Sequence, residues 1–398
     1  MNTKIKIIKY VVVLLMLSIT SLYQTVSAQK QVYYSSDWGE KLPSFPNHLI
    51  LKSNVVFVHE NMTMTCDSAI FNTEENLINA YNNIHIYQDT LHLYGDEFFY
   101  DANIKVAEVF GDTVTLYDGK INLQTDYMVM DRVAQTVRYT THADIWDEEN
   151  TLESNFGTYL IDTKVFEFTD EVLLENNSLN LISDSLFYDS KSKIAYFFSK
   201  TYITTKDSVK INTSKGFYDT KTDDATLYKD NHIINDSKQL VADSIFYNTK
   251  TENSKAYRNI CLTDSVNQII AYSQYLEKDK KDSIPYVFLT NEILLQQVEE
   301  QDTLHLHCDS IWIYFDTNMR AEEMYAYNHV KFYRMDMQGV ADTLFYDIKD
   351  SLVYFLGRPI LWNENNQFTA DTISLKVVEN SVREMFMYPN VIIAQNSD

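Results

Sequence analysis

The chain is poor in the residues that usually interrupt or cross-link a fold. Its 398 residues include only 8 glycines, 5 prolines and 3 cysteines. So little glycine and proline argues against collagen-like sequence, long disordered linkers and glycine-rich calcium-binding repeats. The cysteines, Cys66, Cys261 and Cys308, are too few and too far apart for a disulfide framework, although one bridge could form.

Positive charge is also scarce. The chain has 33 lysines and arginines against 56 aspartates and glutamates, and its formal net charge is −23. A surface of this sign repels nucleic acid and anionic lipid head groups, so we expect no nucleic-acid partner. After the first residues, no stretch is long and apolar enough for a transmembrane helix, so we expect no membrane-spanning segment.

The first 28 residues are predicted to be a cleaved secretory signal peptide. Lys4, Lys6 and Lys9 precede a short apolar run, and Val26-Ser27-Ala28 is a small-residue cleavage site. Cleavage would remove three lysines and no acids, which changes the net charge from −23 to −26. We therefore expect the mature protein to be exported.

Aromatic residues, by contrast, are abundant and occur in a repeat. The chain has 29 tyrosines and 21 phenylalanines, which favour β-strands. The stretch QDTLHLYGD (88–96) returns as QDTLHLHCD (301–309). Both belong to a motif of the form small-Asp-Ser/Thr-apolar-aromatic-Tyr-Asp, with the clearest copies GDEFFYD (95–101), SDSLFYD (183–189), ADSIFYN (242–248) and ADTLFYD (341–347). With weaker copies it recurs about every 29 residues, in roughly eleven units.

Each unit has the pattern of two or three short strands joined by tight turns, often with Asp-x-Lys in the turn, and no helical period competes. Stacked units predict an elongated all-β body with unpaired strand edges at its ends. Counted from the first motif aspartate, positions +2 and +4 are mostly apolar and position +1 is mostly polar. Because strand side chains alternate, we expect positions +2 and +4 to face the interior. Phenylalanines at +3, such as Phe187 and Phe345, would then lie on the outer face, and the sequence leaves their role open.

From Val55 to Ile393, the repeated pattern small-Asp-x-apolar-x-Tyr-Asp, a turn, an Ala-Tyr-like pair and Asn/Gly-x-Val resembles the OstA-like family. That family includes the periplasmic lipopolysaccharide transport protein A. The resemblance implies a β-jelly roll that is open along one side and lies in the periplasm. Association of the protein with the outer membrane is a further possibility. It implies no enzymatic activity and no cofactor. The apolar groove would shield the acyl chains of lipopolysaccharide or a similar lipid during transit to the outer membrane, and edge strands would pair with other proteins of this family.

The resemblance also implies which side chains line the groove. They occupy the +2 and +4 positions of the repeats, namely Phe71, Phe98, Tyr100, Met128, Met130, Leu186, Tyr188, Tyr218, Ile245, Tyr247, Leu344 and Tyr346.

The repeat spacing also predicts a domain organisation. After the signal peptide (1–28) comes a lead-in (29–54), then a first module of repeats (55–272) and a second module (301–398). The charged run EKDKKD (277–282) breaks the spacing, so the segment 273–300 is expected to be a solvated loop between the modules. At its end, NEILLQQVEEQ (291–301) fits a strand or a helical turn, and a strand is favoured. The alternative is one continuous body over 55–398.

Two groups of residues could suggest sharper chemistry. His305 and His307 share a strand face and, with Cys308, could chelate zinc. The earlier copy, however, has His92, Tyr94 and Gly95 at these positions, so it lacks the full ligand set. Repetition of the same strand pattern in both copies explains the residues better than metal binding does, and we expect no metal.

The aspartates at the start and end of the motif recur along the chain, as in Asp96, Asp184, Asp243, Asp342, Asp101, Asp189, Asp219 and Asp347. A catalytic pair needs two acids in unequal surroundings, so we expect these residues to serve turns and strand ends. A calcium-binding ladder is the functional alternative.

Two other function classes stay open from the sequence. One is a structural scaffold or adhesion protein that uses stacked strands to make length and edges. The other is a polysaccharide-active β-helix enzyme. It is disfavoured because the 29-residue unit is long for a β-helix coil, and because the sequence has no unique acidic cluster.

Overall fold

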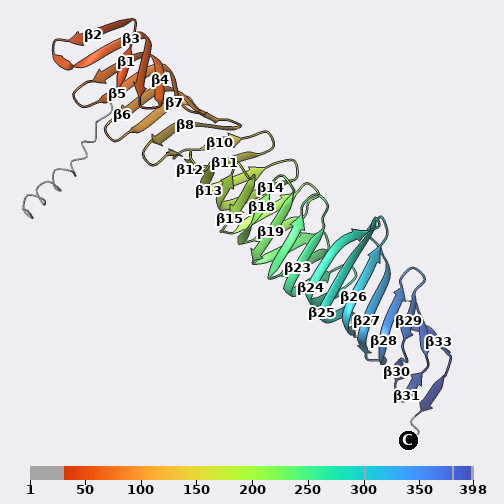
Figure 1. Cartoon of the computed structure of the whole chain (residues 1–398). Helices are drawn as coiled ribbons and strands as arrows, with labels where there is room; N and C mark the ends of the chain where they lie inside the picture. The colour runs from red at the N-terminus through yellow and green to blue at the C-terminus, as the bar shows by residue number, and fades with distance from the viewer. Residues whose placement is uncertain (1–30, 300–301, 379–380, 396–398) are drawn as a thin grey trace, which may run out of the picture. The chain divides into compact units, whose positions relative to one another are not determined.

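The computed structural model describes residues 31–299, 302–378 and 381–395. These residues form 34 strands and no helix, so the predicted all-β fold is confirmed (Figure 1). Accordingly, none of the described segments is a helix that could cross a membrane. The predicted signal peptide, residues 1–28, lies outside the described residues.

The chain divides into two compact units, residues 1–112 (unit 1) and 113–398 (unit 2). The strands of unit 1 are β1 (Tyr33–Ser35), β2 (Trp38–Leu42), β3 (Phe45–His59), β4 (Met62–Asn72), β5 (Leu77–Gln88) and β6 (Leu91–Asp101). The sequence passes from unit 1 to unit 2 within β7 (Val106–Asp118). The predicted lead-in therefore already contains β1, β2 and part of β3.

Unit 2 continues with a mixture of long and short strands up to its middle. They are β8 (Ile121–Asp131), β9 (Thr136–Tyr139), β10 (Ala143–Trp146), β11 (Thr151–Ser154), β12 (Phe156–Leu160), β13 (Val165–Glu175), β14 (Leu179–Asp189), β15 (Ile194–Phe197), β16 (Thr201–Thr205), β17 (Lys210–Thr213), β18 (Lys215–Asp219), β19 (Asp224–Lys229), β20 (Asn231–Asn235), β21 (Lys238–Ala242) and β22 (Ser244–Asn248).

A group of long strands follows, and then a group of short ones. They are β23 (Ser254–Asp264), β24 (Ile269–Lys281), β25 (Ile284–Val298), β26 (Thr303–Phe315), β27 (Ala321–Arg334), β28 (Met337–Asp347), β29 (Leu352–Leu356), β30 (Ile360–Asn363), β31 (Asn366–Thr369), β32 (Thr372–Val378), β33 (Ser381–Tyr388) and β34 (Ile392–Gln395).

The strands of unit 2 form two antiparallel walls. The first half of β14 pairs with β16, and its second half pairs with β15. Strand β15 continues through β18, β19 and β22. We call this side wall A, and it also includes β9, β12, β29 and the halves of the long strands that pair with them. Strand β16 continues through β17, β20 and β21. We call this side wall B, and it also includes β10, β11, β30 and the other halves of the long strands. Both paths meet again in β23. Each long strand thus belongs to both walls, and the walls are joined along a spine where the long strands bend.

Several bends are built from a motif aspartate and two residues with left-handed backbone. In β23, Arg258 and Asn259 have φ of 61° and 50°, and the pairing with β24 shifts register there. The Asn259 side-chain amide donates to the Asp243 carboxylate at 3.0 Å. Asparagine tolerates this backbone region better than most residues. On either side of the bend, Ala256 and Ile260 of β23 are both buried, and so are Ser273 and Leu276 of β24. Both halves of each strand therefore turn buried side chains inward across the bulge.

The second motif aspartate organises a turn. The Asp189 side chain accepts hydrogen bonds from the backbone N–H groups of Lys191 and Ser192 at 2.9 and 3.2 Å. Asp219 accepts equivalent bonds from Lys221 and Thr222. An aspartate that bonds the backbone two and three residues ahead fixes a tight turn. The recurrence of these residues is thus explained by the geometry of strand ends.

The +3 phenylalanines stand in a row of aromatic rings on the outer face of wall A. Tyr325, Phe345 and Tyr354 are directly paired across β27, β28 and β29. Their ring centroids lie 4.6 and 5.6 Å apart, with interplanar angles of 20° and 15°. The rings therefore turn their faces toward one another rather than toward solvent. Cross-strand aromatic pairs of this kind stabilise a sheet.

The segment predicted as a loop, residues 273–300, differs from that expectation. It contains most of β24 and all of β25, which pair along their length. Asp282 and Ser283 both have positive φ and form the two-residue hairpin turn between them. The charged run is compatible with a strand because Lys280 and Lys281 lie exposed at its end, while Glu277 accepts hydrogen bonds from Tyr275 and Tyr286. The division of the repeats into two modules stays a prediction.

Replacement of Phe345 by alanine should destabilise the fold. The change removes two stacked ring pairs from a half-buried position, and we expect the free energy of unfolding to fall by about 1–3 kcal/mol. Urea unfolding followed by tyrosine and tryptophan fluorescence measures this. Phe386→Ala, at an exposed position on β33, is the control and should have the smaller effect. Equal effects of the two changes would contradict a stabilising role for the row.

Candidate functional site

The predicted groove residues lie on the inner face of the strands. Leu186 and Tyr188 are fully buried, and Phe187 between them points to the outer face. Of the twelve residues, eleven are buried and Tyr346 is half-buried. Phe71, Phe98 and Tyr100 belong to unit 1 and the other nine to unit 2. Their inward orientation agrees with the alternation of the sequence, while their contact with lipid stays a prediction.

The +4 residues of unit 2 form one cross-strand row that we call the inner row. Each member pairs in register with the next, from β8 to β33. The row consists of Met130, Val137, Tyr159, Phe166, Tyr188, Ala195, Tyr218, Ala225, Tyr247, Ser254, Lys278, Val287, Ile313, Met324, Tyr346, Val353, Leu375 and Met385. It runs next to the turns of wall A, on the side opposite the spine.

In the first part of unit 2, hydrogen bonds tie wall A to wall B beside the inner row. Asp147 lies in the turn that follows β10 in wall B. Its carboxylate accepts a hydrogen bond from the Tyr188 hydroxyl at 2.9 Å and another from the Lys193 ammonium group at 2.5 Å, both from wall A. Asn150, in the same turn, donates to the Tyr188 oxygen at 3.2 Å. The Asp147 side chain is only 1% exposed and that of Lys193 is 17% exposed. We call such a cross-wall connection a clamp.

Clamps recur at the repeat spacing. Asp118 accepts a hydrogen bond from Tyr159 at 2.7 Å and forms an ion pair with Lys164. Asn176 donates to the Tyr218 oxygen at 3.4 Å. In unit 1, His59 and Glu60 bond Tyr100 and Lys105 in the same manner, each at 2.7 Å.

The sequence analysis identified the tyrosine column but missed its partners in wall B. Asp118, Asp147 and Asn176 follow one another at intervals of 29 residues, and this spacing is the signal that could have found them.

The clamp at Asp147 combines an ionised carboxylate with a protonated phenol. Burial favours a higher pKa for Asp147, but hydrogen bonds from Lys193, from the backbone N–H groups of Glu149 and Asn150, and from Tyr188 outweigh it and lower the pKa. Burial, followed by the charge of Asp147, raises the pKa of Tyr188. At neutral pH Tyr188 is therefore the donor and Asp147 the charged acceptor.

Farther along the inner row, the residues are apolar and half-buried. Val287, Ile313, Met324, Tyr346 and Val353 pair in register across five consecutive strands, β25 to β29. We call these five residues the apolar rim. Burial alone raises the pKa of Tyr346. For Tyr188, which has the same position in the motif, the charge of Asp147 adds to the effect of burial. The apolar rim is therefore a continuous part of the inner row whose apolar side chains are partly accessible.

Behind the apolar rim, the next cross-strand row is buried. Leu289, Ile311, Ala326, Leu344 and Phe355 pair in register across the same five strands and are at most 6% exposed. Between the clamps and the rim, Lys278 interrupts the inner row and forms an ion pair with Glu252 at 2.7 Å. Along the inner row, the face thus changes from the stretch with clamps, past the charged Lys278, to the half-buried apolar rim.

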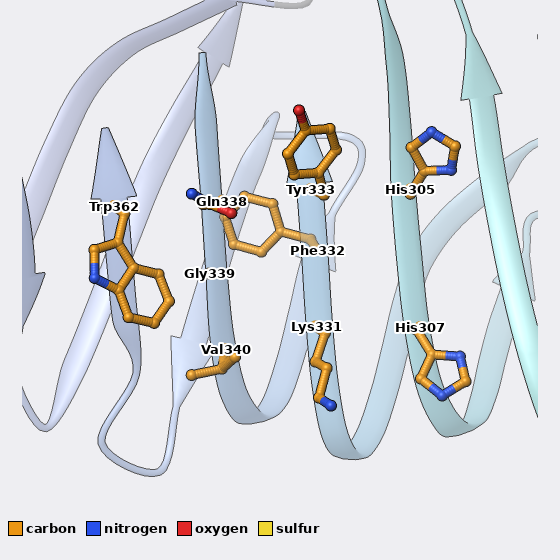
Figure 2. Close-up of a pocket in the computed structure, with 9 residues that line it drawn as sticks. All are labelled: His305, His307, Lys331, Phe332, Tyr333, Gln338, Gly339, Val340 and Trp362. Atoms are coloured by element: carbon orange, nitrogen blue, oxygen red, sulfur yellow. The ribbon is translucent and has the colours of Figure 1, made fainter. Parts of the chain in front are cut away.

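The residues considered for zinc do not converge. Cys308 points to the interior and is 1% exposed, whereas His305 and His307 point to the outer face of wall B. There they line a shallow recess of about 310 Å³, together with Lys331, Tyr333 and Trp362 among others (Figure 2). His307 Nδ1 is already bonded to the Ile293 carbonyl, and His305 Nδ1 to the Gln296 side chain.

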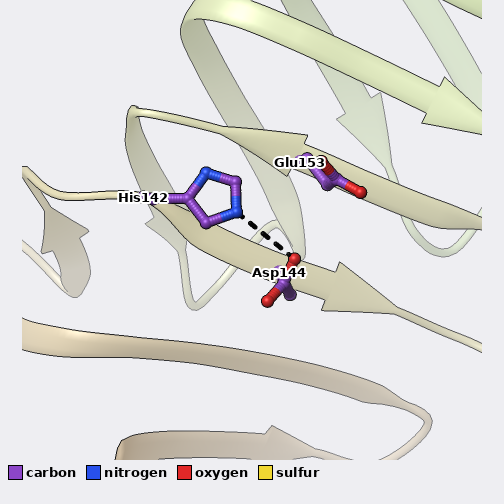
Figure 3. Close-up of side chains that lie close together, drawn as sticks. All are labelled: His142, Asp144 and Glu153. Carbon is purple, nitrogen blue, oxygen red and sulfur yellow. Dashed lines mark ion pairs between the residues drawn. The ribbon is translucent and has the colours of Figure 1, made fainter. Parts of the chain in front are cut away.

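A second group with metal-ligand chemistry lies on the hairpin of β10 and β11. His142, Asp144 and Glu153 place one ligand atom each within 4.8 Å of one another (Figure 3). Asp144 and Glu153 are directly paired across the hairpin, and His142 Nε2 lies 3.5 Å from Asp144. The His142 and Asp144 side chains are more than half exposed, which is the geometry of a solvated surface ion pair.

Comparison with known proteins identified a matching family and similar solved structures. The model of the family described as OstA-like protein matches residues 39–184 and 161–243, together just over half of the chain. Among solved structures, the crystal structure of LptH is similar to this chain. LptH is the LptA homologous periplasmic component of the conserved lipopolysaccharide transport device from Pseudomonas aeruginosa. The identity is 10%, the match covers 42% of this chain and 81% of that chain, and the TM-score is 0.13. No curated protein matches the chain.

The clamp at Asp147 should contribute stability that depends on pH. Asp147→Asn removes the charged acceptor of the hydrogen bonds from Tyr188 and Lys193, so we expect a loss of about 1.5–3 kcal/mol in the free energy of unfolding at pH 7. Because the pKa of Asp147 is lowered in the folded protein, its contribution is fully present above its ordinary value near pH 4. It is lost as the pH falls through the lower folded value.

Urea unfolding of both proteins at pH 7 and pH 3 measures this. The difference between wild type and Asp147→Asn should shrink at pH 3. Asp144→Asn, at an exposed position on the same hairpin, is the control and should lower stability by less than about 1 kcal/mol at either pH. A difference for Asp147→Asn that stays constant between the two pH values would contradict the ionised clamp.

Proposed function

Because this chain belongs to the OstA-like family, we propose that it is a non-catalytic periplasmic protein that holds the acyl chains of lipopolysaccharide, or a similar lipid, during transit to the outer membrane. The observation that carries the proposal is the apolar rim, a continuous row of accessible apolar side chains on the inner face of unit 2. Adjacent strands lie about 4.8 Å apart, so the five strands of the rim offer an apolar strip about 19 Å long.

The energetics suit such a role. Removing one methylene from water is worth about 0.8 kcal/mol, so a whole acyl chain represents on the order of 10 kcal/mol. The rim residues present similar apolar surface on successive strands, and a chain that slides along them meets positions of similar energy. The net charge of the exported chain is strongly negative, so phosphate-bearing head groups should stay in solvent, where salt screens the repulsion beyond about 8 Å.

We further propose that the protein joins other OstA-like proteins through its strand edges. Strands β33 and β34 each pair on one side only within the described residues, with β32 and β31. Phe386, Ile392 and Ile393 on these strands are more than half exposed. An exposed strand with apolar side chains is suited to pairing with a strand of another chain.

A structural scaffold is the second candidate, and a specific observation favours it for part of the chain. Over the clamped part of unit 2, inward side chains such as Phe166, Tyr188 and Tyr218 are fully buried by their own neighbours. A filled interior gives length and stability without a ligand.

Photo-crosslinking from neighbouring positions tests the lipid role. A photoreactive amino acid at Met324, which belongs to the apolar rim, should give adducts with added lipopolysaccharide. The same group at Tyr325, which is also half-buried but belongs to the outer aromatic row, is the matched control and should give few. The delipidated sugar-phosphate should not compete, because binding rests on the acyl chains. Equal adducts at both positions, or full competition by the delipidated sugar, would refute the proposed function.

A further inference from the structure

The inner row connects the apolar rim with the clamped part of unit 2. Tyr188 and Ile313 occupy the same row in register, although one is sealed by a clamp and the other is accessible. An acyl chain that lies against the rim could advance along the row only where the two walls separate. In the clamped part, inward side chains such as Phe166, Tyr188 and Tyr218 are fully buried. A packed core does not accept added methylenes without displacement of side chains.

The clamps at Asp147 and Asn176 are built so that they can open while their wall B side chains keep hydrogen-bond partners. The Asp147 carboxylate also accepts hydrogen bonds from Glu149 and Asn150 backbone N–H groups at 2.9 Å, within its own turn. Asn176 accepts bonds from the backbone N–H groups of Ser178 and Leu179 in the same way. If wall A moves away, these side chains keep their turn partners.

The wall A partner of Asp147 can also return to solvent. Lys193 is partly exposed even in the closed clamp, so its ammonium group can hydrate when the ion pair breaks. An opened clamp therefore leaves no isolated buried charge, which is the usual reason that a broken internal ion pair is so unfavourable.

We propose that the clamps at Asp118, Asp147 and Asn176 are gates for the acyl lipid. With the clamps closed, the acyl chain is confined to the strands of the apolar rim, β25 to β29. When clamps open one after another, the chain enters the stretch from β8 to β22. This inference rests on the proposed lipid-binding function, and it assigns to the clamp residues the control of where along the row the lipid lies.

Hydrogen–deuterium exchange of the intact exported protein, with and without purified lipopolysaccharide, tests the gates. In the wild type, lipid should slow exchange in β25 to β29 and leave β13 and β14 unchanged. In Asp147→Ala, and in the milder Tyr188→Phe, which keeps the ring and removes only the hydroxyl, lipid should also slow exchange in β13 and β14. Loss of one hydrogen bond of ordinary strength corresponds to about a fivefold larger open population, which sets the expected change in occupancy. Asp144→Ala, at an exposed position on the same hairpin, is the control and should behave as the wild type.

The outcomes separate the two claims. If lipid slows exchange in β25 to β29 but the pattern in β13 and β14 is the same in wild type and both clamp variants, the gates are refuted and the lipid role stands. If lipid alters exchange nowhere in the wild type, the proposed function itself is refuted.

Discussion

The bend of the long strands at the spine is the constraint on which the rest of unit 2 depends. In a straight strand, alternate side chains point to opposite faces, so two side chains three residues apart cannot both point inward. In β26, Cys308 and Ile311 are three residues apart and both are buried, because the strand bends where its pairing with β27 shifts register. His329, one of the two left-handed residues of the next strand, bonds Asp309 at 2.9 Å and holds this corner. Without the bend, one of the two walls would turn its apolar residues to water.

The inner and outer faces of wall A divide two tasks. The outer aromatic row, which includes Trp312 and Phe345, holds adjacent strands together through ring contacts. The side chains of the inner face are therefore not needed for these contacts. The inner face can then vary along the stack, from Tyr188 in a clamp to Met324 at the apolar rim, while the strand pairing stays the same. Cross-strand pairs on one face suffice to stabilise a sheet, so such variation does not require a different fold.

The sequence pattern predicts the fold and the inward face because both depend on local alternation. Leu186, Tyr188 and the turn aspartate Asp189 occupy the positions that the motif assigns to them. The pattern fails where an outcome depends on the opposite wall. The segments SDSLFYD (183–189) and ADTLFYD (341–347) have nearly the same sequence, yet Tyr188 is fully buried and Tyr346 is half-buried. The difference comes from Asp147, which lies 41 residues before Tyr188 and on the other wall.

The loop expected over 273–300 failed for a related reason. The charges of EKDKKD look incompatible with a strand when they are read alone, but the end of a strand beside a hairpin turn is exposed. There, the ammonium groups of Lys280 and Lys281 are in contact with water. Glu277 accepts hydrogen bonds from the tyrosine hydroxyls of its own strand and of the neighbouring strand. Alternation over the flanking residues was the better guide than charge.

A filled interior and a lipid-handling role are compatible because of how stacked repeats are stabilised. In such a protein each unit contacts mainly its neighbours, and the free energy of unfolding is close to a sum of local terms. Separation of the walls at one clamp disturbs the packing of one or two repeats and leaves the spine and the outer aromatic row in place. Local opening of this kind lies well below the free energy of global unfolding in proteins generally. An acyl chain that replaces the lost apolar contacts of the opened repeat would offset most of that energy. The clamped stretch can therefore be a stable core when empty and a path for lipid when the clamps open.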